Sequence, residues 1–166
     1  MDKKIFNTAK KALENANIHY EATDGKMLGF SLEGEQANYD VSLLCDEEVG
    51  LLLTVVTCHL FVPQEKIERM CRWIVEANNN IGIGNFAMDT SDGELTFRVS
   101  YPVDKGKIDD YMITVLYVNA VRAFENNFVD IVKTIYFEKE NGEIDLSEEA
   151  LEEARRMADT LDDSEE

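Results

Sequence analysis

The sequence predicts an α+β protein with elements in the order α-β-β-β-β-α-β-β-α. Three segments repeat apolar residues every three or four positions, which is the spacing of an amphipathic helix. Six shorter segments alternate apolar and polar residues or are continuously apolar, which is typical of strands. Polar turns rich in Asp, Asn and Gly separate these segments. At 166 residues the chain is long enough to bury a core without disulfides or metals.

The first helix is predicted from about Lys3 to Asn17, and Asp2 is placed to cap or favour its positive end. Its apolar stripe consists of Ile5, Phe6, Ala9, Ala12, Leu13 and Ala16. Three strands are predicted to follow at Tyr20–Thr23, Met27–Glu33 and Tyr39–Cys45. Asp24-Gly25 is expected to form the first turn, and residues 46–50 the turn into a fourth strand.

The fourth strand, Leu51–Phe61, is apolar on both faces. We assign Leu52, Val56, Cys58 and Leu60 to the side that packs against helices, because Thr57 and His59 make the other face more polar at its end. Leu51, Leu53 and Val55 then point away from the helices. A strand that is apolar on both faces should be covered on both. Either a partner or second subunit, or the C-terminal segment of the same chain, would cover this side.

Pro63 suits the first position of a second helix. Its predicted buried stripe consists of Ile67, Met70, Cys71, Ile74 and Val75. Asn78, Asn79, Asn80 and Gly82 are expected to end the helix, because Asn and Gly tolerate the left-handed conformation. A hairpin follows, in which Phe86 and Met88 pair with the alternating strand Leu95–Tyr101 across the turn Asp89–Gly93.

A long helical pattern runs from Ile108 to Tyr136, with a break or kink expected at Asn126-Asn127. Beyond residue 137 the composition changes, with thirteen acidic residues against Lys139, Arg155 and Arg156. Apolar residues keep helical spacing there, so an acidic amphipathic helix is predicted. We therefore divide the chain into a domain over residues 1–142 and an acidic helix and tail over residues 143–166.

The net charge of −18 argues against nucleic acid or an anionic membrane surface as a partner, and favours basic partners. The three cysteines, Cys45, Cys58 and Cys71, lie in apolar patterns and are predicted to be buried free thiols of a reducing compartment. The N-terminus lacks the apolar stretch of a secretion signal, and the longest apolar run is too short to span a bilayer. We expect a cytoplasmic protein.

The sequence offers no catalytic, cofactor-binding or metal site. Residues 82–87 match the letters of a dinucleotide-binding loop, but they follow a helix and open a strand, which is the reverse of that motif. Asp89, Asp92 and Glu94 lack the ligand spacing of a calcium loop. Cys58 and His59 would lie on opposite faces of a strand, and His19 has no acidic or nucleophilic partner in its sequence pattern.

Between about Ile18 and Ile135 the chain resembles the YbjN family, whose members are often labelled bacterial sensory transduction regulators. The resemblance rests on Asp24-Gly25, the strand with Leu28-Gly-Phe30, the apolar strand before Val62-Pro63, Asn78, and Gly84-Asn85-Phe86 leading through Asp89 and Asp92-Gly93 to Phe97-Arg98. It implies an antiparallel sheet packed with helices, similar in fold to type III secretion chaperones. The acidic terminal helix is not part of the pattern.

The resemblance implies no enzyme activity and no cofactor. The function expected from it is a protein-binding module with a chaperone-like or regulatory role. The acidic charge favours a basic protein partner or client, and the surface that binds it could instead form a homodimer. The alternative is a homo-oligomeric structural or stress-regulatory protein without a client. The residues assigned to partner binding are Leu51, Leu53 and Val55.

Overall fold

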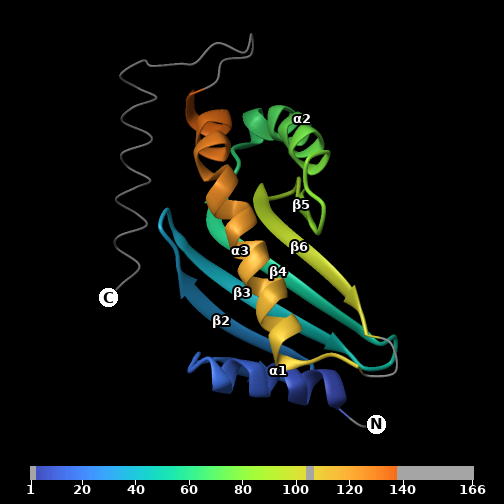
Figure 1. Cartoon of the computed structure of the whole chain (residues 1–166). Coiled ribbons are helices and arrows are strands. Elements are labelled where there is room, and N and C mark those ends of the chain that lie inside the picture. Colours follow the sequence, from blue (N-terminus) through green and yellow to red (C-terminus); the bar gives the residue numbers. More distant parts are fainter. Residues whose placement is uncertain (1–2, 104–106, 138–166) are drawn as a thin grey trace.

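The computed structural model describes residues 3–103 and 107–137. Its helices and strands follow the predicted order, which confirms the α+β class (Figure 1). They are α1 (Lys4–Asn15), β1 (Glu21–Thr23), β2 (Met27–Glu33), β3 (Asn38–Asp46), β4 (Leu51–Phe61), a 3-10 turn (Gln64–Lys66), α2 (Ile67–Asn78), β5 (Asn85–Met88), β6 (Glu94–Pro102), α3 (Asp110–Val132) and a π-helical turn, η3 (Lys133–Phe137). The acidic helix predicted over residues 143–166 lies outside the described residues.

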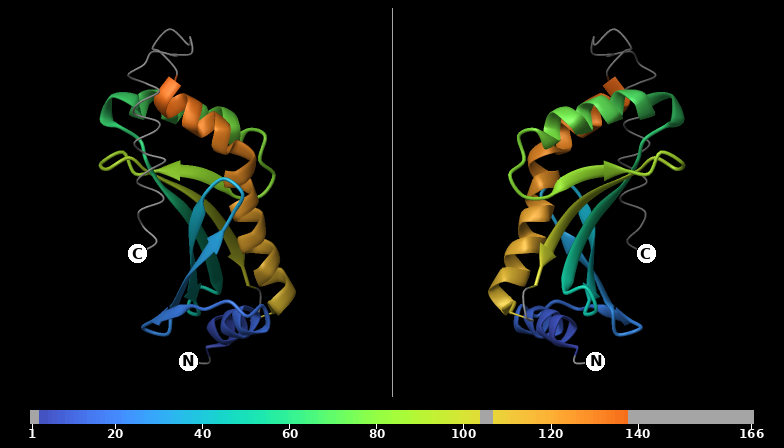
Figure 2. Two further views of the ribbon diagram at one scale, coloured as in Figure 1. Left: turned by 90° about the vertical axis from the view of Figure 1, so that its left-hand side faces the viewer. Right: turned by 90° about the vertical axis from the view of Figure 1, so that its right-hand side faces the viewer.

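The six strands form one antiparallel sheet in the order β1-β2-β3-β4-β6-β5. The long helix α3 crosses one face of this sheet, with α1 near its beginning and α2 near its end (Figures 1 and 2). We call this face, which packs against the helices, the inner face of the sheet. The opposite face is the outer face.

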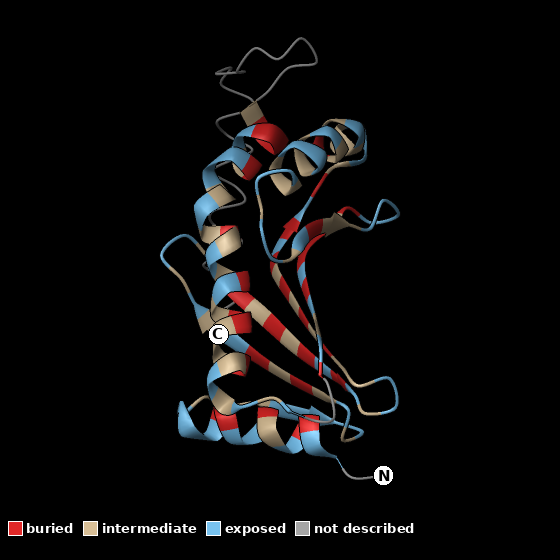
Figure 3. Ribbon diagram, turned by 45° about the vertical axis from the view of Figure 1, so that its right-hand side comes forward, coloured by how far each residue is buried: buried red, intermediate tan, exposed pale blue. Residues whose placement is uncertain are grey.

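The strand β4 supplies much of the core, and its predicted inner residues are confirmed. Leu52, Val56 and Cys58 are fully buried, and Leu60 nearly so. Buried bands recur along the strands that face α3 (Figure 3). Each large aliphatic side chain removed from water in this way contributes about 1.5–3 kcal/mol. Burial of this one face therefore fixes which residues of β4 point outward.

Aromatic rings join α2 and the β5–β6 hairpin to α3. The ring of Phe86 lies 5.1 Å from that of Trp73, 4.9 Å from that of Phe97 and 5.2 Å from that of Phe124, each at a steep angle. Edge-to-face pairs of this kind are favourable beyond the area that they bury. Phe86 of β5 therefore links α2, β6 and α3 through its ring contacts.

Two predicted core residues are exposed instead. Val75 is 63% exposed, because α2 packs at the end of the sheet through a narrower face on which Met70 is buried and Trp73 contacts Phe86. Ala16 is exposed because α1 ends at Asn15 and the chain then turns through Asn17, whose φ is +56°.

The predicted reason for the end of α2 is also wrong. Asn79 is right-handed, and neither Asn78 nor Asn80 has a positive φ. The left-handed residue comes later, at Gly84, and the side chain of Asn78 instead binds the backbone of β5. The expected break in the last helix does not occur either, since α3 continues through Asn127, whose side-chain amide donates to the Ala123 carbonyl over 2.8 Å.

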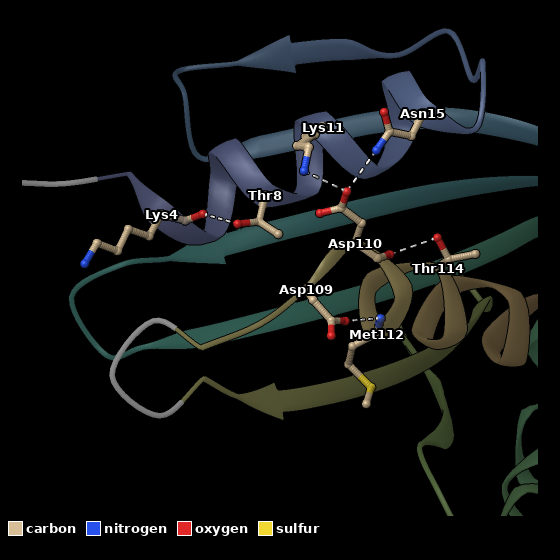
Figure 4. Close-up of polar contacts among 8 residues, drawn as sticks. All are labelled: Lys4, Thr8, Lys11, Asn15, Asp109, Asp110, Met112 and Thr114. Atoms are coloured by element: carbon tan, nitrogen blue, oxygen red, sulfur yellow. Dashed lines mark hydrogen bonds and ion pairs between the residues drawn. The ribbon is translucent and has the colours of Figure 1, made fainter.

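Polar contacts fix the start of α3 against α1 (Figure 4). Asp110 Oδ2 accepts a hydrogen bond from Asn15 Nδ2 over 2.8 Å and lies 3.2 Å from Lys11 Nζ. Asp109 caps the helix, because its side chain accepts from the Met112 N–H over 2.8 Å. These contacts hold both helices on the inner face of the sheet.

Candidate partner-binding face

The three residues predicted to bind a partner lie on the outer face of the sheet. Leu51, Leu53 and Val55 are half-buried, and they alternate with the fully buried Leu52 and with other inner residues of β4. Successive side chains of a strand point to opposite faces, so the burial of one set directs the other outward. The placement of these three residues agrees with the predicted geometry.

Strand pairing brings two further apolar residues beside them. Met27 pairs with Leu44, and Leu44 pairs with Leu53, so the three form a row across β2, β3 and β4. Leu44 is 38% exposed. We define the apolar patch as Met27, Leu44, Leu51, Leu53 and Val55. Sequence reasoning missed Met27 and Leu44, although the adjacent pair Leu43-Leu44 interrupts the alternation of β3 and signals an outward-facing leucine.

A hollow of about 500 Å³ opens at the patch. Met27, Leu44, Leu51 and Leu53 contribute to its apolar walls, and Lys3 and Lys26 lie at its rim together with Asp46, Glu47 and Glu48. The patch is therefore a concave surface with charged surroundings, of the size that accommodates a few side chains of a partner.

Two of the acidic residues at this rim already have structural roles. Asp46 Oδ1 accepts from the backbone N–H groups of Glu48 and Val49, each over 3.0 Å, which forms the turn between β3 and β4. Glu47 Oε1 accepts from the Phe6 N–H over 2.9 Å near the start of α1. Their hydrogen bonds fix the rim relative to the patch.

The other end of the outer face carries a polar group that the sequence did not reveal. Asp40 Oδ1 accepts from the Ser31 hydroxyl over 2.6 Å, and Asp40 Oδ2 lies 2.7 Å from His59 Nε2. His59 has a φ of +56° and sits where the pairing of β4 with β6 shifts register. This irregularity is typical of a β-bulge, which redirects a side chain.

The order of these three residues does not activate a nucleophile. In a serine hydrolase, His lies between Ser and Asp and removes the hydroxyl proton. Here Asp40 lies between Ser31 and His59, so the hydroxyl donates to a carboxylate. The arrangement instead presents a partly exposed carboxylate, which suits a basic side chain of a partner.

Two of the three cysteines, Cys45 and Cys58, are buried as predicted and are unsuited to nucleophilic chemistry, whereas Cys71 is only half-buried. Burial raises the pKa values of the Cys45 and Cys58 thiols to about 12. Since the thiolate is the reactive form, both side chains are inert at neutral pH. Cys58 is fully buried and His59 is exposed, so the two neighbours lie in different environments, as predicted.

The glycine loop joins the end of α2 to β5, in the context that the sequence predicts for a turn. Asp89 also forms a turn, because Ser91 donates to its Oδ1 through the hydroxyl over 2.6 Å and the backbone N–H over 2.9 Å. Among the residues that the structure describes, no three His, Cys, Asp or Glu side chains gather in a way that could hold a metal ion. In the same residues, no helix is both long and apolar enough to cross a membrane.

Comparisons of the sequence and of the structure with known proteins agree with the observed fold. The sequence model of the YbjN family, described as "Putative bacterial sensory transduction regulator", matches residues 10–138. No curated protein matches the chain. Among solved structures, a chain of the HopA1-SchA chaperone-effector complex is similar with a TM-score of 0.56 and 13% sequence identity. The match covers 76% of this chain and 96% of that chain, and it supports likeness of fold.

Proposed function

The chain belongs to the YbjN family, and from this premise we propose that it is a non-enzymatic protein-binding module with a chaperone-like or regulatory role. The solved structure that it resembles comes from a chaperone-effector complex. This likeness supports the proposal only as an analogy of fold, since one fold serves many functions. The stronger support is the apolar patch.

The observation that carries the proposal is the row of Met27, Leu44 and Leu53 on the outer face, flanked by Leu51 and Val55. Contiguous apolar side chains on a surface mark interfaces more often than scattered ones do. The row lies on three neighbouring strands and borders a hollow. A partner with apolar side chains would bury them there.

The charge of the chain indicates which partners the patch favours. A net charge of −18 repels acidic proteins and attracts basic ones over a distance of about a Debye length. A basic client is therefore favoured over a second copy of the same chain. The alternative, a homo-oligomer without a client, would use the same patch and would have to overcome this repulsion.

The test is Leu53→Glu, which places a carboxylate at the β4 end of the row, between Leu51 and Val55. The matched control is Val129→Glu, because Val129 is 54% exposed on α3 and the change adds the same charge. We expect Leu53→Glu to lose the partners that co-purify with the wild type, and Val129→Glu to keep them. Light scattering on each isolated protein separates client binding from self-association. A mass that is lower for Leu53→Glu than for the wild type indicates a homo-oligomer.

Two results would contradict the proposal. If Leu53→Glu stays folded and keeps both its partners and its mass, the interface lies elsewhere. If it unfolds while Val129→Glu does not, the outer face is part of the chain's own core. In that case residues 143–166, which we propose as a segment separate from the domain, become the candidate cover.

A further inference from the structure

The strand β2 has an edge that β1 covers only in part. β1 pairs with Met27, Leu28 and Gly29. β2 continues to Glu33, and its other side pairs with β3 along its whole length. Beyond Gly29 no described strand lies beside β2 on the β1 side.

Hydrogen bonds at the two ends of β2 show which backbone groups face this edge. The Gly34 N–H donates to the Ala37 carbonyl over 2.9 Å, and the Cys45 N–H donates to the Lys26 carbonyl over 2.7 Å. Even-numbered residues of β2 therefore pair with β3. In an antiparallel ladder the alternate residues direct both backbone groups the other way. The N–H and C=O of Ser31 and Glu33 thus face the open edge.

A second hollow, of about 630 Å³, lies beside this edge. Its lining includes His19 and Glu21 from the chain around β1, and Ser31, Asp40 and Ser42 from β2 and β3. Gly29 also contributes, and a Cβ added there would meet no atom within 4 Å. The hollow therefore offers side-chain space on the same face to which Ser31 and Asp40 point.

We propose that the open edge of β2 binds an extended segment of a partner protein, which adds to the sheet as an antiparallel strand and carries Lys or Arg at alternate positions. The inference rests on the proposed protein-binding function and concerns a surface other than the apolar patch. Backbone pairing with Ser31 and Glu33 provides the attachment. Asp40 and Glu21 provide acceptors for the basic side chains.

Charge selects this occupant over a second copy of the chain. Pairing two β2 edges around a two-fold axis would bring both Glu33 side chains to the same face, close together, and would join two chains of net charge −18. Like charges on neighbouring strands destabilise a pairing. Acidic side chains protect an edge against self-association, but they favour a basic strand.

The probe is a fluorescein-labelled peptide, Lys-Val-Lys-Val-Lys-Val-Lys, whose binding is followed by anisotropy. Ser31→Pro removes the N–H at the edge, where proline is tolerated, and Ser31→Ala keeps the N–H and removes only the hydroxyl. We expect Ser31→Pro to bind at least about tenfold more weakly than Ser31→Ala, which corresponds to the loss of one backbone hydrogen bond. A Glu-Val peptide of the same length should not bind.

Changes in the peptide test the geometry without altering the protein. In an antiparallel pair, the peptide residue opposite Ser31 places its side chain on the same face as Ser31 and exchanges both backbone hydrogen bonds with it. The peptide residues that direct their side chains toward Asp40 are the lysines, so the lysine amides must make these backbone bonds. N-methylation of the lysine amides should therefore abolish binding, and N-methylation of the valine amides should preserve it. The reverse result overturns the antiparallel arrangement.

Three other results overturn the proposal: no saturable binding of the basic peptide to the wild type, equal binding by folded Ser31→Pro and Ser31→Ala, or a wild-type dimer that only Ser31→Pro dissociates. The last would identify a second copy as the occupant. Leu53→Glu should still bind the peptide, because its substitution lies in the apolar patch. Partner capture by Leu53→Glu tests the proposed function, and peptide binding by Ser31→Pro tests the strand-binding edge. Either proposal can therefore be contradicted without the other.

Discussion

The side-chain amide of Asn78 forms two hydrogen bonds with the backbone of Phe86. The Phe86 N–H donates to Asn78 Oδ1 over 2.8 Å, and Asn78 Nδ2 donates to the Phe86 carbonyl over 3.0 Å. The amide thus takes the place of a neighbouring strand at the edge formed by β5. This edge of the sheet is closed at Phe86, whereas no strand among the described residues pairs with the edge at Ser31.

Asn78→Ala should therefore lower the free energy of unfolding by about 1–3 kcal/mol, because the part-buried Phe86 N–H loses its partner and the Phe86 carbonyl keeps only the 3.2 Å bond from Asn85 Nδ2. Urea denaturation measures the change. The matched control is Asn79→Ala, one position further along the chain at an exposed site, for which we expect a change within about 0.5 kcal/mol. Equal effects of the two substitutions would show that the Asn78 amide adds nothing specific.

The burial of two thiols predicts selective labelling. With pKa values raised to about 12, Cys45 and Cys58 should resist a thiol reagent in the folded protein near pH 8, while the half-buried Cys71 reacts first. All three cysteines should react once the protein is denatured. Mass spectrometry of labelled peptides identifies the modified residue, and early labelling of Cys58 would indicate local opening of β4.

The β5–β6 turn predicts an acid-sensitive contribution. The hydroxyl and backbone N–H of Ser91 donate to Asp89. These two hydrogen bonds hold the pKa of the Asp89 carboxyl below its ordinary value of 3.8. Because the folded-state pKa is lowered, the stabilisation is present above 3.8 and is lost as the pH falls through the folded-state pKa.

Ser91→Ala should raise the pKa of Asp89 toward 3.8, as followed by its side-chain carbon signal in an NMR titration. The urea midpoints of the wild type and Ser91→Ala should also differ less at about pH 2 than at about pH 7, because the Asp89 carboxylate is lost as the pH falls. An Asp89 pKa that does not respond to Ser91→Ala would mean that the hydroxyl bond does not form in solution.

The proposed domain boundary predicts the effect of a truncation. A chain that ends after Gly142 should keep its sheet and helices, because the core already includes Ile131 and Ile135 at the end of the described helical region. Its near-UV circular dichroism should match that of the full chain, with a modest loss of stability. A truncated protein without near-UV signal would mean that residues 143–166 cover essential core.

The period of the apolar residues determined much of this fold. The bounds of β2 and β4 agree with the prediction, and so do the inner residues of β4, because a strand with one buried face has a fixed alternation. The same argument placed Leu51, Leu53 and Val55 on the outer face. These features depend on neighbours within one segment, which a sequence displays directly.

Strand register and helix packing were decided only by the tertiary structure. Which residue lies opposite Leu53, or which side of Ser31 is left without a strand, depends on pairing between segments that the sequence does not align. Val75 shows the same limit, because its exposure follows from where α2 rests on the sheet rather than from the pattern of α2. Local periodicity sets the direction of a side chain within its own element, whereas its neighbours are set by free energy summed over contacts between distant segments.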